Sequence, residues 1–413
     1  MKKYYLETFG CKLNYTDSQR IKNELDKEFK LSSLDEADFV ILNTCAVVEK
    51  TERKIFKLAD DLRKKNKIVI MTGCLPMVSN ECLKHADKVI GIRSSNKINE
   101  IIKGIETSCF KESKKKCCFS ETKGTSSVII PIAEGCIGEC TYCISRLARK
   151  ELKSFEIKDI ILNVKKALNL GYKEVQLTSQ DLSIYGLDKG KLMLPQLLKE
   201  LIKIKGNFKI KLGMMNPGAT KKILKPLLKI YESDKLYKFV HIPLQSGSNN
   251  VLKSMKRKYS VDDFIFIAKE FRKKFKDGVI ATDIIVGHPQ ELEKDFMKTM
   301  SVIKKTKPDI IHTFKFSKRK NTPDYELKDL PDRIKKQRSR KLTKLFIEIN
   351  EQRNKKFINK EFECLMVKNG FARNNAGRAI VVNKGQIGYY MWVKITNSKW
   401  NYLMGEVVEK SKI

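Results

Sequence analysis

The stretch VIIPIAEGCIGECTYC, residues 128–143, joins an apolar strand-like run to three closely spaced cysteines. Cys136, Cys140 and Cys143 form a CxxxCxxC pattern, so that three thiolates within eight residues can converge on one metal centre. Structural zinc sites normally have four protein ligands, and no second CxxC lies elsewhere in the chain to complete one. A zinc ribbon closed by a distant Cys or His is the alternative. The spacing favours a cubane iron–sulfur cluster with one iron open to a further ligand.

Length and composition indicate a globular protein with several domains. The chain has 413 residues, enough for two or three hydrophobic cores, with 41% hydrophobic and 32% charged residues. No apolar run is long enough to span a membrane, and the first residues turn polar too soon for a signal peptide. The 11 cysteines are mostly solitary and irregularly spaced, unlike a disulfide framework. We therefore expect a cytoplasmic protein whose thiols bind metal.

The net charge is strongly positive. Lys and Arg number 84 against 48 acidic residues, which gives a formal charge of +36. An excess of this size indicates a polyanionic partner, and nucleic acid is favoured over a membrane surface because no amphipathic anchor stands out. A general lysine bias of the source proteome is the alternative explanation.

Residues 1–110 alternate apolar runs with helical stretches, which predicts a parallel sheet covered by helices. Cys11, Cys45 and Cys74 follow the strand candidates YLETFG, VILNT and IVIMTG. Because the carboxyl ends of strands form the ligand crevice of an open α/β sheet, we expect these cysteines to lie close together as a second metal site. Three unrelated buried cysteines are the alternative. Residues 111–127 are polar and read as a linker.

Residues 128–350 continue the strand–helix alternation with a longer period. The strand candidates are SVIIPIAE, EVQLTS, KIKLGMM, FVHIPLQ, GVIATDIIVG and DIIHTFKF. Five or six such units predict a partial (β/α) barrel with its chemistry at the carboxyl ends of the strands. The polar residues expected at that rim are Gln180, Asp181, Asn216, His241, Gln245, Gly287 and His288.

Residues 351–413 change character. Short alternating segments separated by Gly- and Asn-bearing turns predict a small antiparallel β-barrel, joined to the preceding domain by a basic helix around 331–358. Aromatic and basic residues alternate in these segments, among them Arg373, Arg378 and Trp392. Such residues suit base stacking and phosphate contact, although core packing of the barrel would account for many of the aromatics.

Taken together, these motifs resemble the radical S-adenosylmethionine methylthiotransferases along essentially the whole chain. The matching segments at the cysteines are TFGCKLNYTDS, NTCAV, TGCLP and EGCIGECTYC. The chain is most similar to the archaeal and eukaryotic branch that acts on N6-threonylcarbamoyladenosine in tRNA. That branch is indicated by LTSQDLSIYGLD, LGMMNP, FVHIPLQSGSNNVLKSMKRKY, TDIIVG and Ala148-Arg149.

The resemblance implies an α/β multidomain enzyme with three parts. These are an amino-terminal cluster domain (1–110), a radical domain (128–350) built as a partial (β/α) barrel, and an RNA-binding barrel called TRAM (351–413). Cys136, Cys140 and Cys143 would hold the [4Fe–4S] cluster that binds S-adenosylmethionine. The second cysteine set would hold an auxiliary [4Fe–4S] cluster. The reaction would replace the C2 hydrogen of the modified adenosine at position 37 of tRNA with a methylthio group. A flavodoxin- or ferredoxin-type electron donor and a sulfur source are further expected partners.

The resemblance also suggests contacts to S-adenosylmethionine and to tRNA. The S-adenosylmethionine contacts would be Tyr142, Gln180, Asp181, Gln245, Ile285 and Gly287. The tRNA contacts would be Arg149, Arg333, Arg340, Arg373 and Arg378.

The sequence departs from the family in two places. Lys150 stands where the family usually has glycine, and His288-Pro289-Gln290 stands where it usually has Phe-Pro-Gly. A left-handed conformation at Gln290 would cost about 1–2 kcal/mol. Three other functions compete with the expected one: methylthiolation of isopentenyladenosine in tRNA, methylthiolation of a ribosomal-protein aspartate, and RNA binding by a non-enzymatic iron–sulfur protein.

Overall fold

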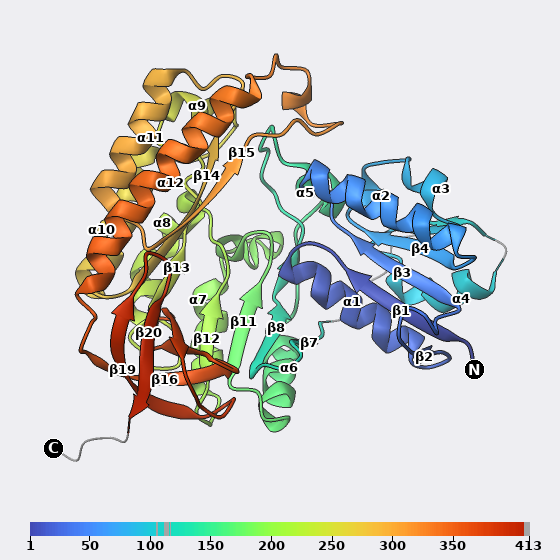
Figure 1. Cartoon of the computed structure of the whole chain (residues 1–413), viewed down its shortest axis with the longest axis horizontal. Helices are drawn as coiled ribbons and strands as arrows, with labels where there is room; N and C mark the ends of the chain where they lie inside the picture. The colour runs from blue at the N-terminus through green and yellow to red at the C-terminus, as the bar shows by residue number, and fades with distance from the viewer. Residues whose placement is uncertain (105, 111–114, 116, 409–413) are drawn as a thin grey trace. The chain divides into compact units, whose positions relative to one another are not determined.

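The computed structural model describes residues 1–104, 106–110, 115 and 117–408, which form two compact units (Figure 1). The first unit comprises Met1–Ser120, Ile129–Phe155 and Ser317–Glu326. The second unit comprises Glu121–Val128, Glu156–Phe316 and Leu327–Ile413. Both sets of cysteines singled out in the sequence therefore belong to the first unit. The predicted linker 111–127 includes residues 111–114 and 116, which lie outside the described residues.

The first unit is built on a parallel sheet in the order β2-β1-β3-β4-β5-β6. Its strands are β1 (Lys3–Thr8), β2 (Lys30–Leu31), β3 (Phe39–Thr44), β4 (Ile68–Gly73), β5 (Lys88–Ile90) and β6 (Ser108–Cys109). All six residues of β3 are buried, as expected for a central strand covered on both faces. The helices are α1 (Lys12–Leu25), α2 (Glu49–Lys64), α3 (Cys82–His85) and α4 (Ile98–Lys103).

Two apolar clusters hold these helices to opposite faces of the sheet (Figure 1). Ile55 and Ala59 of α2 pack with Val40 and Val69 on one face. The α1 and α4 helices pack with Ile41 on the other face. The segments that follow β1, β3 and β4 begin at the carboxyl ends of these neighbouring strands.

The rest of the first unit carries the CxxxCxxC loop. The short strands β9 (Ala133–Glu134) and β10 (Lys153–Ser154) pair antiparallel, and they enclose the loop and helix α5 (Ile144–Arg149). The Thr141 hydroxyl donates to the Asp324 carboxylate at 2.9 Å, which fastens the segment 317–326 to this loop.

The second unit contains the remaining strand–helix repeats. Its sheets have the orders β12-β11-β8-β7 and β13-β14-β15. The strands are β7 (Ser120–Glu121), β8 (Ser127–Pro131), β11 (Glu174–Thr178), β12 (Lys209–Leu212), β13 (Phe239–His241), β14 (Val279–Val286) and β15 (Ile310–Lys315). Of these, Ser120 of β7 and residues 129–131 of β8 are assigned to the first unit. Intervening helices are α6 (Ile157–Asn169), α7 (Leu194–Lys203), α8 (Pro217–Ile230), α9 (Asn249–Ser254), α10 (Val261–Lys274) and α11 (Glu293–Thr306). This arrangement is the predicted partial (β/α) barrel.

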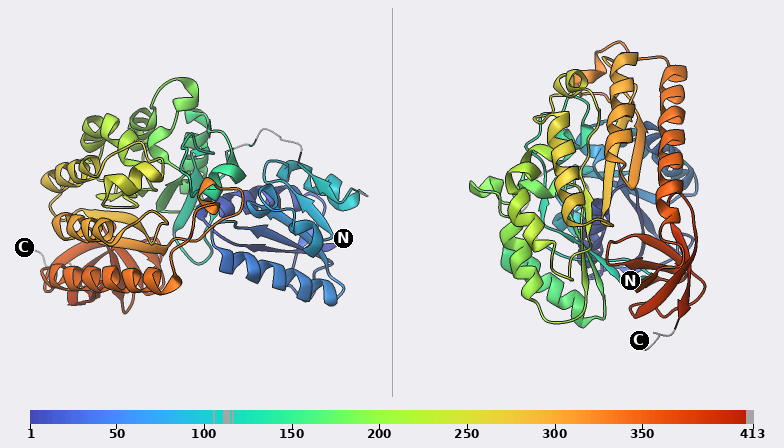
Figure 2. Two further views of the ribbon diagram at one scale, coloured as in Figure 1. Left: turned by 90° about the horizontal axis from the view of Figure 1, so that it is seen from above. Right: turned by 90° about the vertical axis from the view of Figure 1, so that its left-hand side faces the viewer.

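The second unit ends in a closed barrel ordered β16-β17-β18-β20-β19. The strands are β16 (Glu361–Lys368), β17 (Phe371–Asn374), β18 (Ala379–Val382), β19 (Tyr390–Ser398) and β20 (Leu403–Val408). Neighbours pair antiparallel except β18 and β20, which are parallel. The 24-residue helix α12 (Asp332–Lys355) leads into this barrel (Figure 2). The buried Asp309 carboxylate forms ion pairs with Arg272, Arg353 and Arg378. The pair with Arg378 connects the barrel to the start of β15.

The longer predicted elements are present with shifted ends. The sequence predicts a helical stretch from Thr16 to Lys30, and the observed helix α1 begins at Lys12 and ends at Leu25. Helical stretches are also predicted at 156–169, 192–204, 219–232, 261–275 and 291–306, and the observed helices α6, α7, α8, α10 and α11 lie within three residues of these bounds. The six-residue helices α5 and α9 were not predicted. Among the described residues, no helix is both long enough and apolar enough to cross a bilayer.

Candidate metal and cofactor site

Cys11, Cys45 and Cys74, which we call the amino-terminal triad, converge at the carboxyl edge of the first sheet. They follow β1, β3 and β4, which are neighbours in the sheet order. The Cys11 and Cys74 sulfurs lie 3.7 and 3.8 Å from the same oxygen, Oδ1 of Asn14. The predicted proximity of these cysteines is therefore present in the fold.

Gly10 explains how Cys11 and Cys45 approach each other. Its φ of +106° is a backbone conformation that side-chain-bearing residues rarely adopt. A Cβ at this position would lie 2.8 Å from the Cys45 Cβ and 3.0 Å from its Sγ. The loop after β1 thus needs glycine both for its turn and for its contact with Cys45.

The thiol of Cys74 is buried, and burial raises its pKa to about 11 despite the nearby Arg149 guanidinium. A thiol in such surroundings is protonated unless a metal binds it, because coordination to a metal deprotonates it. Cys11, Cys45 and Cys74 are free thiols in this structure. The donor set therefore suits a thiolate-bound metal cluster rather than a redox disulfide.

A buried charged cluster lies beside the amino-terminal triad, and sequence patterns alone did not indicate it. Arg149 is 1% exposed, and its Nη2 contacts Asn14 Oδ1 at 2.7 Å and Asp17 Oδ2 at 2.8 Å. Lys115 bridges Asp17 and Glu134 at 2.9 and 2.7 Å. Arg149 was predicted to contact tRNA phosphate, and in this structure its guanidinium is enclosed by the protein's own anions.

Cys136, Cys140 and Cys143, the loop triad, lie on the irregular backbone between β9 and α5. The Gly138 amide donates to the Cys136 sulfur at 3.2 Å. A Cβ on Gly138 would meet the Cys136 and Cys140 sulfurs at 3.2 and 3.6 Å. The Cys136 and Cys140 sulfurs therefore both lie close to Gly138. Cys143 is the residue before α5, so the helix begins at the last cysteine.

Two of the proposed cofactor contacts in the second unit have unsatisfied polar atoms. The Oε1 atoms of Gln180 and Gln245 are buried, and neither has a hydrogen-bond partner among the described residues. Gln245 has a φ of +66°, and its backbone bonds to Asp283 and Ile285 at 2.8 and 2.9 Å. Buried unpaired amide oxygens are uncommon and indicate a missing donor. A bound polar ligand would supply it.

The other proposed contacts are engaged within the protein. Asp181 Oδ1 accepts from the amides of Ser183 and Asn216 at 2.9 and 3.1 Å. Burial raises the pKa of Asp181. Gly287 donates its amide to Glu291, and a Cβ there would meet the Lys335 side chain at 2.3 Å. Tyr142 is half-buried in the loop of the first unit.

His241, Asp283 and His312 form a hydrogen-bonded group on β13, β14 and β15. Only His241 was singled out from the sequence. A nitrogen of each imidazole lies 2.8 Å from Asp283 Oδ1. Burial alone would raise the pKa of Asp283, but these two hydrogen bonds outweigh it and hold the pKa at about 2. The two imidazoles therefore share one carboxylate oxygen, and the three side chains could together hold a metal ion.

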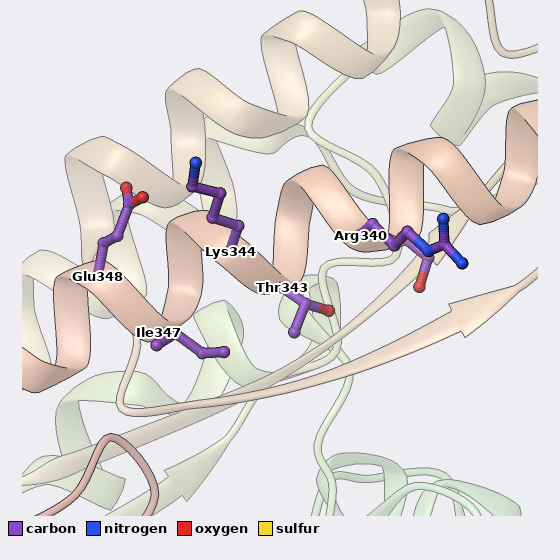
Figure 3. Close-up of a pocket in the computed structure, with 6 residues that line it drawn as sticks. Arg340, Thr343, Lys344, Ile347 and Glu348 are labelled. Carbon is purple, nitrogen blue, oxygen red and sulfur yellow. The ribbon is translucent and has the colours of Figure 1, made fainter.

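The arginines proposed for tRNA contact fall into two classes. Arg333 and Arg340 are exposed on α12 (Arg340 is shown in Figure 3). Arg378 is 7% exposed and contacts Asp309 Oδ1 at 2.9 Å, while Arg373 contacts Glu174 Oε2 at 3.2 Å. Arg378 was predicted to contact tRNA phosphate, and in this structure its charge pairs with Asp309, next to β15. Arg373 is likewise committed to a buried carboxylate.

The two departures from the family pattern have different structural consequences. Lys150 has φ +54° and ψ −138°, a conformation favourable only to glycine. Gln290 does not have a positive φ, so the expected strain there is absent. Instead the Gln290 amide donates to Nδ1 of the buried His288 at 3.3 Å, and the His288 ring packs against Phe316. The histidine thus stabilises an alternative turn.

Comparisons with known proteins agree with this geometry. Residues 3–92 match the uncharacterized protein family UPF0004, and residues 130–303 match the radical SAM superfamily. A protein of Archaeoglobus fulgidus named probable threonylcarbamoyladenosine tRNA methylthiotransferase is 41% identical over 97% of this chain and 98% of its own length. One of Methanocaldococcus jannaschii with the same name is 38% identical over 98% of this chain and 96% of its own length.

More distant relatives and solved structures extend the comparison. A tRNA-2-methylthio-N(6)-dimethylallyladenosine synthase of Clostridium novyi is 32% identical over 98% of this chain and 97% of its own length. The structure of the radical S-adenosylmethionine methyltransferase TsrM from Kitasatospora setae matches with a TM-score of 0.59 at 11% identity, covering 79% of this chain and 75% of that one. The structural likeness shows the fold alone. On the identity to full-length relatives, this chain belongs to the radical S-adenosylmethionine tRNA methylthiotransferase family.

Proposed function

We propose that this protein converts N6-threonylcarbamoyladenosine at position 37 of tRNA to its 2-methylthio derivative. The observation that carries the proposal is the pair of cysteine triads in one compact unit. The names of the archaeal relatives, at up to 41% identity over nearly the whole chain, supply the substrate.

The residues present fit the cofactors that this reaction needs. Each triad offers three thiols, which leaves one iron of a [4Fe–4S] cluster without a protein ligand. The loop triad would hold the cluster that binds S-adenosylmethionine, and the amino-terminal triad would hold the auxiliary cluster. The clusters supply the one-electron cleavage of S-adenosylmethionine and the site for sulfur, chemistry that no side chain provides.

The chain's own residues bind and orient these groups. Gln180 and Gln245 offer buried acceptors to a polar ligand, since their Oε1 atoms have no partner among the described residues. Tyr142, Asp181, Ile285 and Gly287 complete the proposed S-adenosylmethionine contacts. Asp181 and Gly287 act there mainly by holding the backbone, because their own bonds are internal.

Binding of tRNA is proposed for the exposed face of α12 and for the carboxy-terminal barrel, which we propose is a TRAM domain. Arg333, Lys336, Arg340 and Lys344 are exposed on this helix, and Figure 3 shows Arg340 and Lys344. The +36 net charge favours a polyanion. The protein would act in the cytoplasm, with a flavodoxin- or ferredoxin-type electron donor and a sulfur source as partners. The domain boundaries at 110, 128 and 351 remain part of this proposal.

A second candidate substrate is isopentenyladenosine-37, which the name of the Clostridium novyi relative favours. That relative is 32% identical, against 41% for the Archaeoglobus relative, so the threonylcarbamoyl substrate is preferred.

A competition assay distinguishes the two substrates. Reconstituted protein, S-adenosylmethionine, sulfide and a reductant are incubated with equal amounts of two tRNAs, one carrying each modified adenosine. Digested nucleosides are then analysed by mass spectrometry. We expect a methylthio mass gain on threonylcarbamoyladenosine at least tenfold faster than on isopentenyladenosine. The reverse preference would overturn the proposed substrate and leave the family assignment intact.

A further inference from the structure

Arg149 occupies an unusual position for a charged side chain. It is the last residue of α5, is 1% exposed, and contacts Asn14 Oδ1 and Asp17 Oδ2 at 2.7 and 2.8 Å. Its Nη1 is also buried and has no hydrogen-bond partner among the described residues, and it lies 3.8 Å from Oε2 of Glu134. A buried guanidinium is costly unless it is fully paired. Nη1 is therefore a donor that a further anionic group would satisfy.

Asn14 contacts both Arg149 and the amino-terminal triad. The Asn14 amide nitrogen donates to the carbonyl oxygens of Phe9 and Thr44 at 2.7 and 2.9 Å. These bonds hold the backbone just before Cys11 and Cys45. The Asn14 Oδ1 that accepts from Arg149 is the same atom that lies 3.7 Å from the Cys11 sulfur and 3.8 Å from the Cys74 sulfur. Through Asn14 the guanidinium is linked to the sulfurs of Cys11 and Cys74, and it also lies within hydrogen-bonding reach of the Cys74 thiol.

Arg149 places a positive charge beside the amino-terminal triad. Its guanidinium interacts electrostatically with Cys11 and Cys74 and lowers the pKa of the Cys74 thiol against the effect of burial. An oxidised [4Fe–4S] core with three thiolates has a net charge of −1, and one electron makes it −2. The positive charge of Arg149 thus suits an anionic cluster and would favour its reduced form.

The backbone around Arg149 also joins the two triads. Helix α5 begins directly after Cys143 of the loop triad and ends at Arg149. The Cys136 amide donates to the carbonyl oxygen of Lys150 at 3.1 Å, and the Arg93 guanidinium donates to that of Arg149. The six residues of α5 span about 9 Å, at 1.5 Å per residue. One short helix therefore sets both the end of the loop triad and the placement of the guanidinium.

We propose that Arg149 is a positioning residue of the auxiliary-cluster site, which holds Asn14 against the amino-terminal triad and raises the reduction potential of the cluster bound there. The proposal rests on the proposed ligand sets. It assigns to Arg149 a role inside the protein in place of a contact with tRNA.

The test measures the auxiliary cluster alone. The parent is the full chain with Cys136→Ala, Cys140→Ala and Cys143→Ala, reconstituted anaerobically, in which only the amino-terminal triad can hold a cluster. Arg149→Met removes the charge, and Arg149→Lys retains it with fewer hydrogen bonds. Arg20→Met is the matched control, because Arg20 is also buried and bonds to Asp17 at 2.7 Å but lies beside Cys118. Iron content and a redox titration followed by electron paramagnetic resonance are recorded for each protein.

We expect the equilibrium constant for reduction to fall at least tenfold in Arg149→Met, which is a shift of about −59 mV for one electron. The equilibrium constant should fall less in Arg149→Lys than in Arg149→Met, and it should fall less than threefold in Arg20→Met. An unchanged potential in Arg149→Met, or an equal fall in Arg20→Met, would overturn the proposal. If Arg149→Met does not retain four irons, Arg149→Lys decides the test. Normal iron loading and a reduction potential close to that of the parent in Arg149→Lys support the proposal. Loss of the cluster in both Arg149 variants and in Arg20→Met overturns it.

Failure of the proposed ligand set gives a different result. In that case the parent would hold no cluster, or adding Cys11→Ala to the parent would leave the iron content unchanged.

Discussion

Replacement of Gly10 by alanine tests whether the close approach of Cys11 and Cys45 forms the auxiliary site. Gly10 has φ +106°, and the new Cβ would lie 2.8 Å from Cys45 Cβ and 3.0 Å from its Sγ. Carbon atoms in contact prefer about 3.5–4.0 Å, so either the loop after β1 or the Cys45 side chain must move. Each movement separates two sulfurs of the amino-terminal triad.

The magnitude follows from two contributions. A non-glycine residue in this backbone conformation costs about 1–3 kcal/mol, and overpacking a tight contact adds about 1–3 kcal/mol. Gly206→Ala isolates the first contribution, because Gly206 has φ +113° and a Cβ added there would have no atom within 4 Å among the described residues. Gly10→Ala should therefore destabilise the chain by about 2–6 kcal/mol and Gly206→Ala by about 1–3 kcal/mol.

Iron analysis after anaerobic reconstitution measures the effect on the site. The parent protein should hold about eight irons, four for each cluster, and Gly206→Ala should hold the same number. Gly10→Ala should hold about four, with cleavage of S-adenosylmethionine retained and methylthiolation lost. Full iron loading and full methylthiolation in Gly10→Ala would refute the reasoning, because the amino-terminal triad would then tolerate the displacement.

Three further predictions concern strain, acid stability and tRNA binding. Lys150→Gly should raise the free energy of unfolding in urea by up to about 1 kcal/mol, because relief of the strained φ of +54° outweighs the conformational entropy that glycine loses on folding. The Lys150→Ala control should give no such gain, because alanine has the same strain at this φ. Burial opposes ionisation of Asp309, but Arg378, Arg272 and Arg353 outweigh it and lower its pKa from 3.8 to about 2. The ionised Asp309 carboxylate contributes about 2 kcal/mol to the free energy of unfolding above pH 4, and this contribution is lost as the pH falls from about 4 towards 2. Asp309→Asn should therefore flatten the pH dependence of the free energy of unfolding of the cluster-free chain between pH 4 and 2. An equally steep dependence in Asp309→Asn would contradict this assignment. If five to eight phosphates are neutralised, log K for tRNA should fall with log salt at a slope of about −4 to −7, and Arg333→Ala with Arg340→Ala should reduce the slope by about 0.9 per residue. An unchanged slope would exclude α12 from the RNA surface.

Much of the fold follows from local patterns in the sequence. The apolar run at Phe39–Thr44 and the long periodic helices of the second half have lengths and spacings that specify their type. The convergence of Cys11, Cys45 and Cys74 was also predictable. Each follows a strand, and parallel strands bring their carboxyl ends to one edge.

The partners of charged residues were not predictable, because they depend on tertiary contacts. Arg149 and Arg378 occur in basic, RNA-binding-like contexts in the sequence, yet each is buried against a carboxylate, Asp17 or Asp309, from a distant segment. The short helix α5 also escaped prediction, since its six residues carry too few turns for a periodic signal. Asn14 showed no sign of its role, because that role arises from two carbonyl groups and two sulfurs that meet only in the folded chain.

The most direct test of the two-cluster account compares the parent with Cys45→Ala and Cys136→Ala. Each reconstituted protein is incubated with S-adenosylmethionine, sulfide, a reductant and tRNA carrying threonylcarbamoyladenosine, and both 5′-deoxyadenosine and the nucleosides are measured by mass spectrometry. The account predicts a methylthio mass gain at position 37 for the parent only, with 5′-deoxyadenosine still formed by Cys45→Ala and absent for Cys136→Ala. Methylthiolation by Cys45→Ala at the parent's rate would contradict it.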